Sequence, residues 1–289
     1  MKPITPLRIK RKIIRTFFRE QWSLLVCDPT GNILTSIVPP KNCQWADPFP
    51  VDYTGKTYIF VEQQIGHGNG TLGVIELYPN LTHSDFIPIL EKEYHLSFPN
   101  VFCLEQNDKI IWYMIPETHE NETIDLYRSV DFPYQWIYEM TLMENVKAVD
   151  TTVFFHNLKW WLFTSIGTES ISVNKNFSVF YSDTFPSKNW IPHPQNPVCS
   201  DLKNSRMAGS VFINKKNDRL NRPAQNCLKD YGKETNINEI VELNPVSYKE
   251  KVIKTIAPER DLHAVCTHTI NFSKNYMLRD IKTRKLLKF

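Results

Sequence analysis

The stretch Trp45-Ala-Asp-Pro-Phe49 continues to Val51, turns at Tyr53-Thr-Gly-Lys56 and returns as the apolar run Tyr58-Ile-Phe-Val61, which ends at Glu62. Two short runs rich in aromatic and β-branched residues, joined by a turn that contains glycine, are typical of a β-hairpin. The stretch therefore predicts two antiparallel strands, with Asp47 near the start of the first strand and Glu62 at the end of the second.

Four further copies of this hairpin follow along the chain. The second copy pairs Phe98-Pro-Asn-Val-Phe102 with Ile111-Trp-Tyr-Met114, and the third pairs Asp150-Thr-Thr-Val-Phe154 with Trp160-Trp-Leu-Phe163. Two weaker copies begin at residues 208 and 268. A unit of roughly fifty residues built from short strands indicates a β-propeller with one blade per repeat.

Further apolar runs complete the predicted blades. A third run follows each of the first four hairpins, and a proline turn and a fourth run come after it. The fifth copy has only two strands, whereas Trp22–Val26 and Ile33–Ile37 near the beginning of the chain offer the missing third and fourth. The sequence therefore predicts an all-β, five-bladed β-propeller over residues 21–289, whose last blade is closed by strands from both termini.

Residues 1–20 differ in kind from the rest of the chain. Their lysines and arginines interleave with isoleucine and phenylalanine, which predicts a short basic amphipathic helix. The C-terminal tail, Lys282–Lys288, is also basic. Two interpretations stay open: peripheral contact with an anionic membrane face, or a solvated helix and a frayed tail. The second is favoured because two basic segments alone bind a membrane weakly.

Composition narrows the function classes. The net charge of +3 over 289 residues argues against a general nucleic-acid binder. Six cysteines lie far apart without the spacing of a zinc site, as expected of reduced thiols. The N-terminus lacks the apolar core of a secretory signal, and no stretch approaches the roughly 20 apolar residues of a membrane span. These features predict a cytoplasmic protein, with any membrane contact at the inner face.

The propeller topology predicts where candidate functional residues gather. The first strand of a blade lines the channel and the second runs back beside it, so the start of one and the end of the other share a mouth. Five residues there are candidates for catalysis, and five more for binding a sugar or nucleotide-sugar ligand. The catalytic candidates are Asp47, Glu62, Glu117, Asp150 and His268; the binding candidates are Trp45, Ser165, Arg206, Arg222 and Gln225.

These residue types suit carbohydrate chemistry. Paired carboxyl groups serve as acid and as base or nucleophile at an anomeric centre. Arginines suit a donor phosphate, and tryptophans such as Trp45, Trp160 and Trp161 can stack on sugars. Each has a structural alternative: an Asp-Pro turn, a surface carboxylate at a strand end, a core histidine, or a core tryptophan. No cofactor is indicated by a motif. A divalent metal stays open, because calcium can use water and backbone oxygens that leave no spacing pattern.

Several motifs together resemble a known family. The motifs are WADPF at 45–49, RMAGSVF at 206–212, NRPAQNCLKDYG at 221–232 and THTIN at 267–271. They are similar to the five-bladed propeller at the N-terminus of plant glucosamine inositolphosphorylceramide transferases, and to related proteins of bacterial glycan loci. The resemblance covers about residues 40 to 280. It implies a role in glycan assembly, although a separate domain is the recognised transferase of the plant proteins.

The architecture also resembles glycoside hydrolase family 43 more distantly. In that family a base Asp, a pKa-tuning Asp and an acid Glu lie on successive blades. Asp47 stands at the position of the base, Phe98-Pro-Asn100 replaces the tuning Asp, and Asp150 replaces the Glu. The sequence thus points first to a glycosyltransferase-like enzyme of surface glycan or glycolipid synthesis. The alternatives are a non-catalytic sugar-binding module and a glycosidase.

Overall fold

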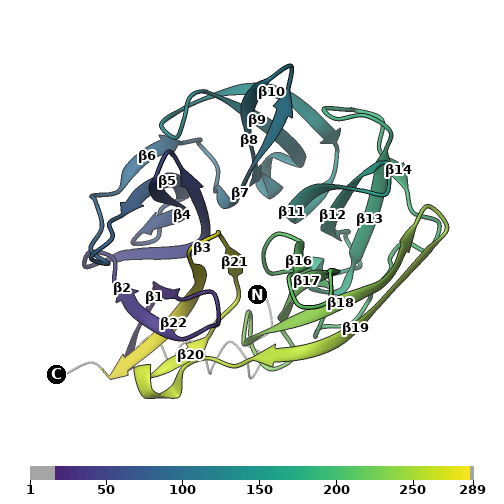
Figure 1. The fold of residues 1–289 in the computed structure, drawn as a ribbon. Helices are drawn as coiled ribbons and strands as arrows, with labels where there is room; N and C mark the ends of the chain where they lie inside the picture. Colours follow the sequence, from purple (N-terminus) through teal and green to yellow (C-terminus); the bar gives the residue numbers. More distant parts are fainter. Residues whose placement is uncertain (1–16, 287–289) are drawn as a thin grey trace.

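Five β-sheets stand around a central axis, as Figure 1 shows for the computed structural model, which describes residues 17–286. This confirms the predicted five-bladed propeller. Blades 1, 2 and 3 have four strands each. Blade 1 comprises β3 (Cys43–Tyr53), β4 (Lys56–Ile65), β5 (Gly70–Leu77) and β6 (Ile87–Leu90). Blade 2 comprises β7 (Ser97–Gln106), β8 (Lys109–Glu117), β9 (Thr123–Asp131) and β10 (Gln135–Glu144). Blade 3 comprises β11 (Lys147–His156), β12 (Lys159–Gly167), β13 (Phe177–Ser182) and β14 (Ile191–Pro192).

Blades 4 and 5 have a broken inner strand. Blade 4 comprises β15 (Arg206–Met207), β16 (Phe212–Asn214), β17 (Arg219–Asn226), β18 (Glu234–Asn244) and β19 (Ser247–Ile256). Blade 5 comprises β20 (Ala264–Cys266), β21 (Ile270–Phe272), β22 (Met277–Leu286), β1 (Phe18–Cys27) and β2 (Ile33–Ile37). Three one-turn 3-10 helices complete the described elements: η1 (His119–Asn121), η2 (Val173–Lys175) and η3 (Arg260–Leu262). None of the helices among residues 17–286 is long and apolar enough to cross a membrane.

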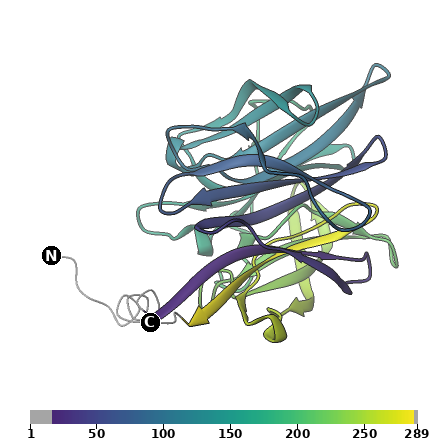
Figure 2. The ribbon, with the colours of Figure 1, turned by 90° about the vertical axis from the view of Figure 1, so that its left-hand side faces the viewer.

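Blade 5 closes the ring with strands from both ends of the chain, as predicted. β1 pairs antiparallel with β22 over its whole length, from Phe18 opposite Leu286 to Cys27 opposite Met277. Figure 2 shows the two strands side by side, purple against yellow. Leu24, Leu25 and Val26 in β1 are fully buried. Burial of these side chains, together with ten aligned residue pairs, makes β1 an integral strand of the blade.

Two boundaries of the sequence prediction change. Residues 18–20 were assigned to the basic segment, but they lie in β1 because Glu20 pairs with Arg284 of β22. Residues 282–286 were assigned to a tail, but they form the end of β22 for the same reason. The predicted helix over residues 1–16 lies outside the described residues, and the membrane contact stays a prediction.

A shared irregularity shapes the inner strands of blades 1, 2 and 3. Asp47, Phe98 and Asp150 have positive φ angles of 52°, 47° and 54°. Each lies at a register shift between the first and second strands of its blade. Side chains other than glycine rarely adopt this conformation, and it costs of the order of 1–3 kcal/mol. The bulge takes these residues out of the strand alternation, which brings Asp47 to the cavity at the channel mouth and packs Phe98 against Phe49 in the core.

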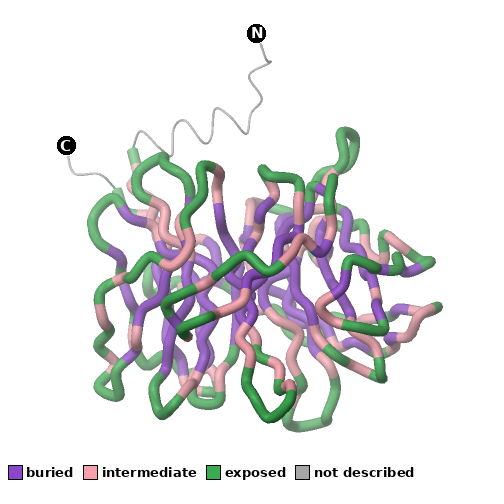
Figure 3. Tube along the Cα trace, turned by 90° about the horizontal axis from the view of Figure 1, so that it is seen from above, coloured by how far each residue is buried: buried purple, intermediate pink, exposed green. Residues whose placement is uncertain are grey.

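A chain of hydrogen bonds crosses the channel and joins all five blades. Asn271 Nδ2 donates to the carbonyl of Pro48 over 3.0 Å, and Ser210 N donates to Asn271 Oδ1 over 2.8 Å. Ser210 Oγ donates to Asn100 Oδ1 over 3.1 Å, and Asn100 Nδ2 donates to the carbonyl of Thr151 over 3.3 Å. The buried residues gather in the middle of the ring in Figure 3. These bonds close the channel within that buried layer.

Gly209 allows this close approach of blade 4 to blade 5. Its φ is 145°, and a Cβ there would lie 2.0 Å from the carbonyl oxygen of Ile270. Only glycine fits both the backbone angle and the contact. The close approach of blade 4 to blade 5 at the channel therefore explains why the RMAGSVF motif has a glycine at position 209.

Candidate functional site

A cavity of about 220 Å³ opens at one mouth of the channel, above the crossing hydrogen bonds. Its wall combines carboxylates, basic side chains, amides and aromatic rings from four of the five blades. The lining residues are Trp22, Gln44, Ala46, Asp47, Glu62, Gln64, His95, Ser97, Glu117, Arg206, Tyr231 and His268. Of the ten candidates from the sequence, five line this cavity: Asp47, Glu62, Glu117, Arg206 and His268. The predicted convergence at one mouth is therefore found for these residues.

Asp47 is a buried carboxyl group at the floor of the cavity. Its Oδ1 accepts a hydrogen bond from Thr269 Oγ1 at 2.5 Å, and its Oδ2 accepts one from the backbone N–H of Phe98 at 3.2 Å. Burial raises the pKa of Asp47 to about 7, with a contribution from neighbouring carboxylates that His268 opposes. Near neutral pH this group can therefore exchange a proton with a ligand.

His268 is held against Asp47 by a carboxylate behind it. His268 Nδ1 lies 2.5 Å from Asp280 Oδ2, and His268 Nε2 lies 3.6 Å from Asp47 Oδ1. Burial opposes the charged form of His268, but Asp280 and Asp47 outweigh it and raise its pKa to about 9. The imidazole stacks on Trp22, with ring centroids 4.3 Å apart. His268 is thus a fixed positive charge beside Asp47.

Asp280 lies behind Asp47 and His268 and holds both residues in place. It is fully buried and accepts backbone N–H bonds from His268, Thr269 and Asp47 at 2.8, 3.0 and 3.2 Å. Burial raises its pKa, but His268 and the N–H donors outweigh that effect and leave the pKa below its usual value. A permanently ionised Asp280 therefore fixes both the backbone and the charge of its neighbours.

Asp47, His268 and Asp280 are also the described residues best placed to hold a metal ion, since one ligand atom of each lies within 4.8 Å of the others. Two ligand atoms on one ion lie about 3 Å apart or more. The 2.5 Å between His268 Nδ1 and Asp280 Oδ2 is the distance of a direct ion pair. In this arrangement His268 and Asp280 share a proton.

Arg206 organises the opposite side of the cavity. Its Nε lies 2.5 Å from Asp150 Oδ2, and its Nη2 lies 3.5 Å from Glu117 Oε2. The guanidinium also covers the ring of Tyr231, 5.0 Å from the centroid. Gln225 Nε2 donates to the same oxygen of Asp150 over 3.2 Å. Asp150 and Gln225 therefore lie behind the wall and position Arg206 through hydrogen bonds.

Glu117 is the second carboxyl group that faces the cavity from a buried position. Burial raises its pKa well above the usual value, and Asp150 raises it further against the opposing charge of Arg206. Its Oε2 is buried and has no hydrogen-bond donor. A protonated carboxyl group satisfies such an oxygen by donating its own hydrogen to an acceptor. Glu117 can therefore deliver a proton to a ligand atom.

Glu62 carries the third carboxylate of the wall. His95 Nε2 lies 3.3 Å from Glu62 Oε1, and His95 Nδ1 accepts the backbone N–H of Gly70 over 2.9 Å. Because Nδ1 is an acceptor here, the ring proton lies on Nε2 and points at Glu62. Glu62 is thus fixed by the Nε2–H of His95, and this contact raises the pKa of His95.

Four of the five predicted binding residues do not line the cavity: Gln225 lies behind the wall on Asp150, and the other three lie elsewhere. Arg222 lies fully buried between blades 3 and 4, where it pairs with Glu250 and covers the ring of Phe177. Ser165 donates its hydroxyl to the carbonyl of Ser205. Trp45 packs on Phe86, because its neighbours in the strand alternation are the residues that face the cavity. These three residues therefore do not line the cavity, and their contact with a ligand stays a prediction.

Four residues that line or support the cavity were missed by the sequence prediction. Trp22 was assigned to a closing strand only, and His95 precedes a repeat without belonging to its pattern. Tyr231 lies in the NRPAQNCLKDYG motif, where it stands between Arg206 and His268. Asp280 had a signal of its own, as an acidic residue between the apolar Leu278 and Ile281 of one strand. A buried acid in such a run needs a partner.

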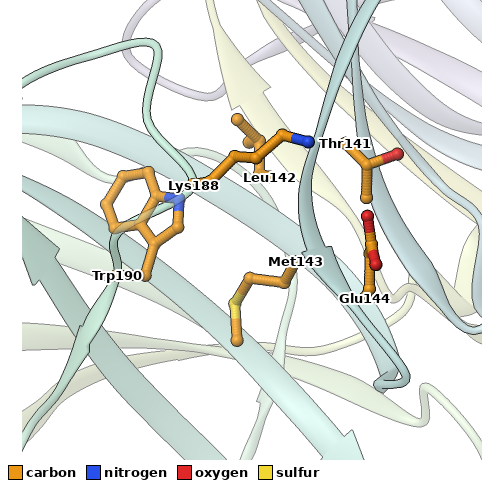
Figure 4. A pocket seen from close by; sticks show the side chains of 6 residues that line it. All are labelled: Thr141, Leu142, Met143, Glu144, Lys188 and Trp190. Carbon is orange, nitrogen blue, oxygen red and sulfur yellow. The ribbon is translucent and has the colours of Figure 1, made fainter.

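A larger cavity of about 370 Å³ lies between blades 2 and 3, as Figure 4 shows. Trp190 stands on one side of it and Glu144 and Thr141 on the other, with Met143 between them. The indole Nε1 of Trp190 is buried without a hydrogen-bond partner. None of the candidate residues lines this cavity. The smaller cavity is therefore the candidate site, because it alone of the two gathers several ionisable groups with perturbed pKa values.

The packing of Gly232 against His268 gives a testable prediction. The φ of Gly232 is 58°, and a Cβ there would lie 2.4 Å from His268 Cβ. Gly232→Ala should therefore lower the free energy of unfolding by about 1–3 kcal/mol more than the backbone strain alone. Urea denaturation measures this. Gly55→Ala is the matched control, because Gly55 has a φ of 80° and a Cβ there would meet no atom within 4 Å. Equal losses in the two variants would contradict the prediction.

The chain matches a known protein family over most of its length. The model of the family described as glucosamine inositolphosphorylceramide transferase 1, N-terminal, matches residues 29–265. The glucosamine inositolphosphorylceramide transferase 1 of Oryza sativa subsp. japonica is 31% identical over 233 residues, which cover 77% of this chain and 30% of the rice protein. The Arabidopsis thaliana protein of the same name is 33% identical over 164 residues, which cover 56% and 20% of the two chains. The chain thus spans less than a third of the length of these relatives.

Two solved structures share the fold. A family 117 glycoside hydrolase from the marine bacterium Zobellia galactanivorans has a TM-score of 0.56 at 11% identity, covering 91% of this chain and 90% of that one. An exo-β-1,3-galactanase from Clostridium thermocellum has a TM-score of 0.57 at 9% identity, covering 92% of this chain and 63% of that one. At these identities the likeness establishes the propeller architecture.

Proposed function

Because the chain belongs to the family of the N-terminal part of glucosamine inositolphosphorylceramide transferase 1, we propose that it is a carbohydrate-active enzyme that makes or breaks a glycosidic bond in the channel-mouth cavity. The observation that carries the proposal is a pair of carboxyl groups in one cavity, Asp47 and Glu117, held in different surroundings. Glycoside hydrolysis uses such a pair, and so does transfer of a sugar from a glycoside to an acceptor other than water by the same mechanism.

Each carboxyl group suits one role. Asp47 has a pKa of about 7 and lies beside the charged His268, so it can ionise and act as the base or nucleophile. Glu117 has a raised pKa and an unpartnered buried oxygen, so it can act as the acid that protonates the leaving oxygen. Asp150 beside Glu117 raises the pKa of Glu117 further and favours the protonated acid, against the opposing charge of Arg206.

We favour transfer to an acceptor over hydrolysis, because the relatives of this chain are named as transferases. Their name also supplies the first compounds to test, glucosamine as the sugar and inositolphosphorylceramide as the acceptor lipid. Hydrolysis is the same chemistry with water as the acceptor.

The experiment that tests the proposal uses the proton donor. Wild-type protein is incubated with a panel of alkyl glycosides and dinitrophenyl glycosides of common sugars, and product release is followed by mass spectrometry. Glu117→Gln should lower turnover of alkyl glycosides by about 10²-fold, because their leaving group needs a proton. Turnover of dinitrophenyl glycosides should change little, because that leaving group departs without one. Glu105→Gln, an exposed position of the same blade, is the matched control.

A second candidate function is a sugar-binding module without catalysis. The chain spans only 30% of the rice relative, so the named transferase activity can reside in the rest of that protein. If wild-type protein binds a sugar of the panel and turns none over, including with a nucleotide-sugar donor and a lipid acceptor, the module is correct and the catalytic proposal is wrong.

A further inference from the structure

The charges on the cavity wall limit what the cavity can bind. Three carboxyl groups line it, those of Asp47, Glu62 and Glu117, and two more lie directly behind it, those of Asp150 and Asp280. Three basic side chains line it as well: Arg206, His95 and His268. A negatively charged ligand would have to find a positive group among these three that is not already engaged.

Each of the three basic side chains is engaged by a carboxylate. Arg206 contacts Asp150 and Glu117, and its Nη1 also donates to Asn174 Oδ1 over 3.3 Å. His268 lies between Asp280 and Asp47. His95 has its one ring hydrogen directed at Glu62. The described wall therefore offers no free cation.

Releasing Arg206 for a phosphate would be costly. The side chain of Asp150 is only 3% exposed, so a departing guanidinium would leave a buried, unpaired carboxylate. Backbone donors at a helix N-terminus are the usual substitute for a cation. None of the three short helices among the described residues contributes a residue to the wall. A phosphate group in the cavity would find no free cation to offset the negative charge of Glu62 and of ionised Asp47.

The size and depth of the cavity add a second limit. The hydrogen bonds from Pro48 through Asn271, Ser210 and Asn100 to Thr151 close the channel below it. Its volume of about 220 Å³ is below the range of roughly 300–1,000 Å³ for drug-sized ligands. A cavity that is small and closed at one end can enclose one sugar ring and excludes a continuous chain passing through.

We infer that the cavity binds a single terminal sugar unit that carries no phosphate, and that it discriminates against sugar phosphates and nucleotide sugars. This inference rests on the proposed function, since it assumes that the cavity is the carbohydrate site. It assigns the cavity to the glycoside or acceptor end of the reaction. The bond cleaved in this cavity would therefore be that of a phosphate-free glycoside and not that of a nucleotide sugar.

The test is a set of calorimetric titrations with matched ligands. Methyl glycosides of glucose, galactose, mannose, glucosamine and N-acetylglucosamine are compared with the corresponding sugar 1-phosphates and nucleotide sugars. At least one methyl glycoside should bind, and its phosphorylated counterpart should bind about tenfold more weakly or worse. Equal or tighter binding of the phosphate would overturn this inference and leave the proposed function standing. Absence of binding by every compound would overturn both.

A pair of variants tests the electrostatic cause. Glu62→Gln removes one wall carboxylate while keeping an acceptor for His95, so the disadvantage of the phosphorylated ligand should shrink several-fold. Glu139→Gln makes the same change on the outer strand of blade 2, where Glu139 pairs with Arg128, and should leave the disadvantage unchanged. A disadvantage that is unaltered in Glu62→Gln would overturn the inference.

Discussion

Substituting asparagine for Asp47 is expected to lower turnover by about 10³-fold or more while leaving sugar binding nearly unchanged. Asparagine tolerates the positive φ of 52° and can still accept the hydroxyl hydrogen of Thr269, and it loses only the 3.2 Å bond from the backbone N–H of Phe98, so the fold should persist. It cannot ionise and therefore cannot serve as base or nucleophile. Product release and calorimetric affinity, measured on the same preparation, separate the two effects.

Asp52→Asn is the matched control, because Asp52 lies on the same strand outside the cavity and binds Thr57. Wild-type turnover should also rise with pH through about 7, where Asp47 loses its proton and becomes active. Near-normal turnover by Asp47→Asn would refute the assigned role, whatever the pH profile shows.

The second large effect is expected on stability, at Arg222. Its Nε and Nη2 bind the two carboxylate oxygens of Glu250 at 2.8 and 2.5 Å, and its guanidinium lies 4.0 Å from the centroid of the Phe177 ring. Arg222→Ala leaves the mostly buried Glu250 without its partner, which should lower the free energy of unfolding by about 3–5 kcal/mol. Urea denaturation followed by tryptophan fluorescence measures the loss.

The double variant Arg222→Met with Glu250→Leu is the informative comparison. Replacing both charges by apolar groups of similar size should recover most of the lost stability, because no unpaired charge is left. Sugar affinity of the folded variants should match that of the wild type, since Arg222 does not line the cavity. A loss below about 1 kcal/mol in Arg222→Ala would mean that this buried pair contributes little to the stability of blade 4.

The repeat pattern was sufficient to predict the ring, its closure and much of the site. Asp47 lies in the first half of β3, Glu62 lies in the second half of β4 and Glu117 ends β8, and the antiparallel topology alone brings such positions to one mouth. Arg206 begins β15 and His268 lies between the two pieces of the inner strand of blade 5, so both follow the same rule. These positions needed no knowledge of side-chain packing.

Strand alternation explains what the sequence prediction placed wrongly. Arg222 and Gln225 lie three residues apart on β17, so they project to opposite faces, and Gln225 is the one that reaches Asp150. Trp45 stands between Gln44 and Ala46, which both line the cavity, so its ring faces away. Asp280 could not be placed in advance, because its partners His268 and Asp47 depend on how β22 meets the inner strands.

The pairing of β1 with β22 has a consequence for synthesis on the ribosome. Leu24 emerges early, but its partner Asp280 is added some 250 residues later, which at 5–20 residues per second takes roughly 10 to 50 s. During that interval β1 presents an apolar strand with an unpaired edge. Chaperones therefore have longer to bind β1 than any later strand of the nascent chain. A ribosome-stalled chain that ends before β22 would contain Asp47 and His268. It would lack Asp280, the carboxylate that holds His268 against Asp47.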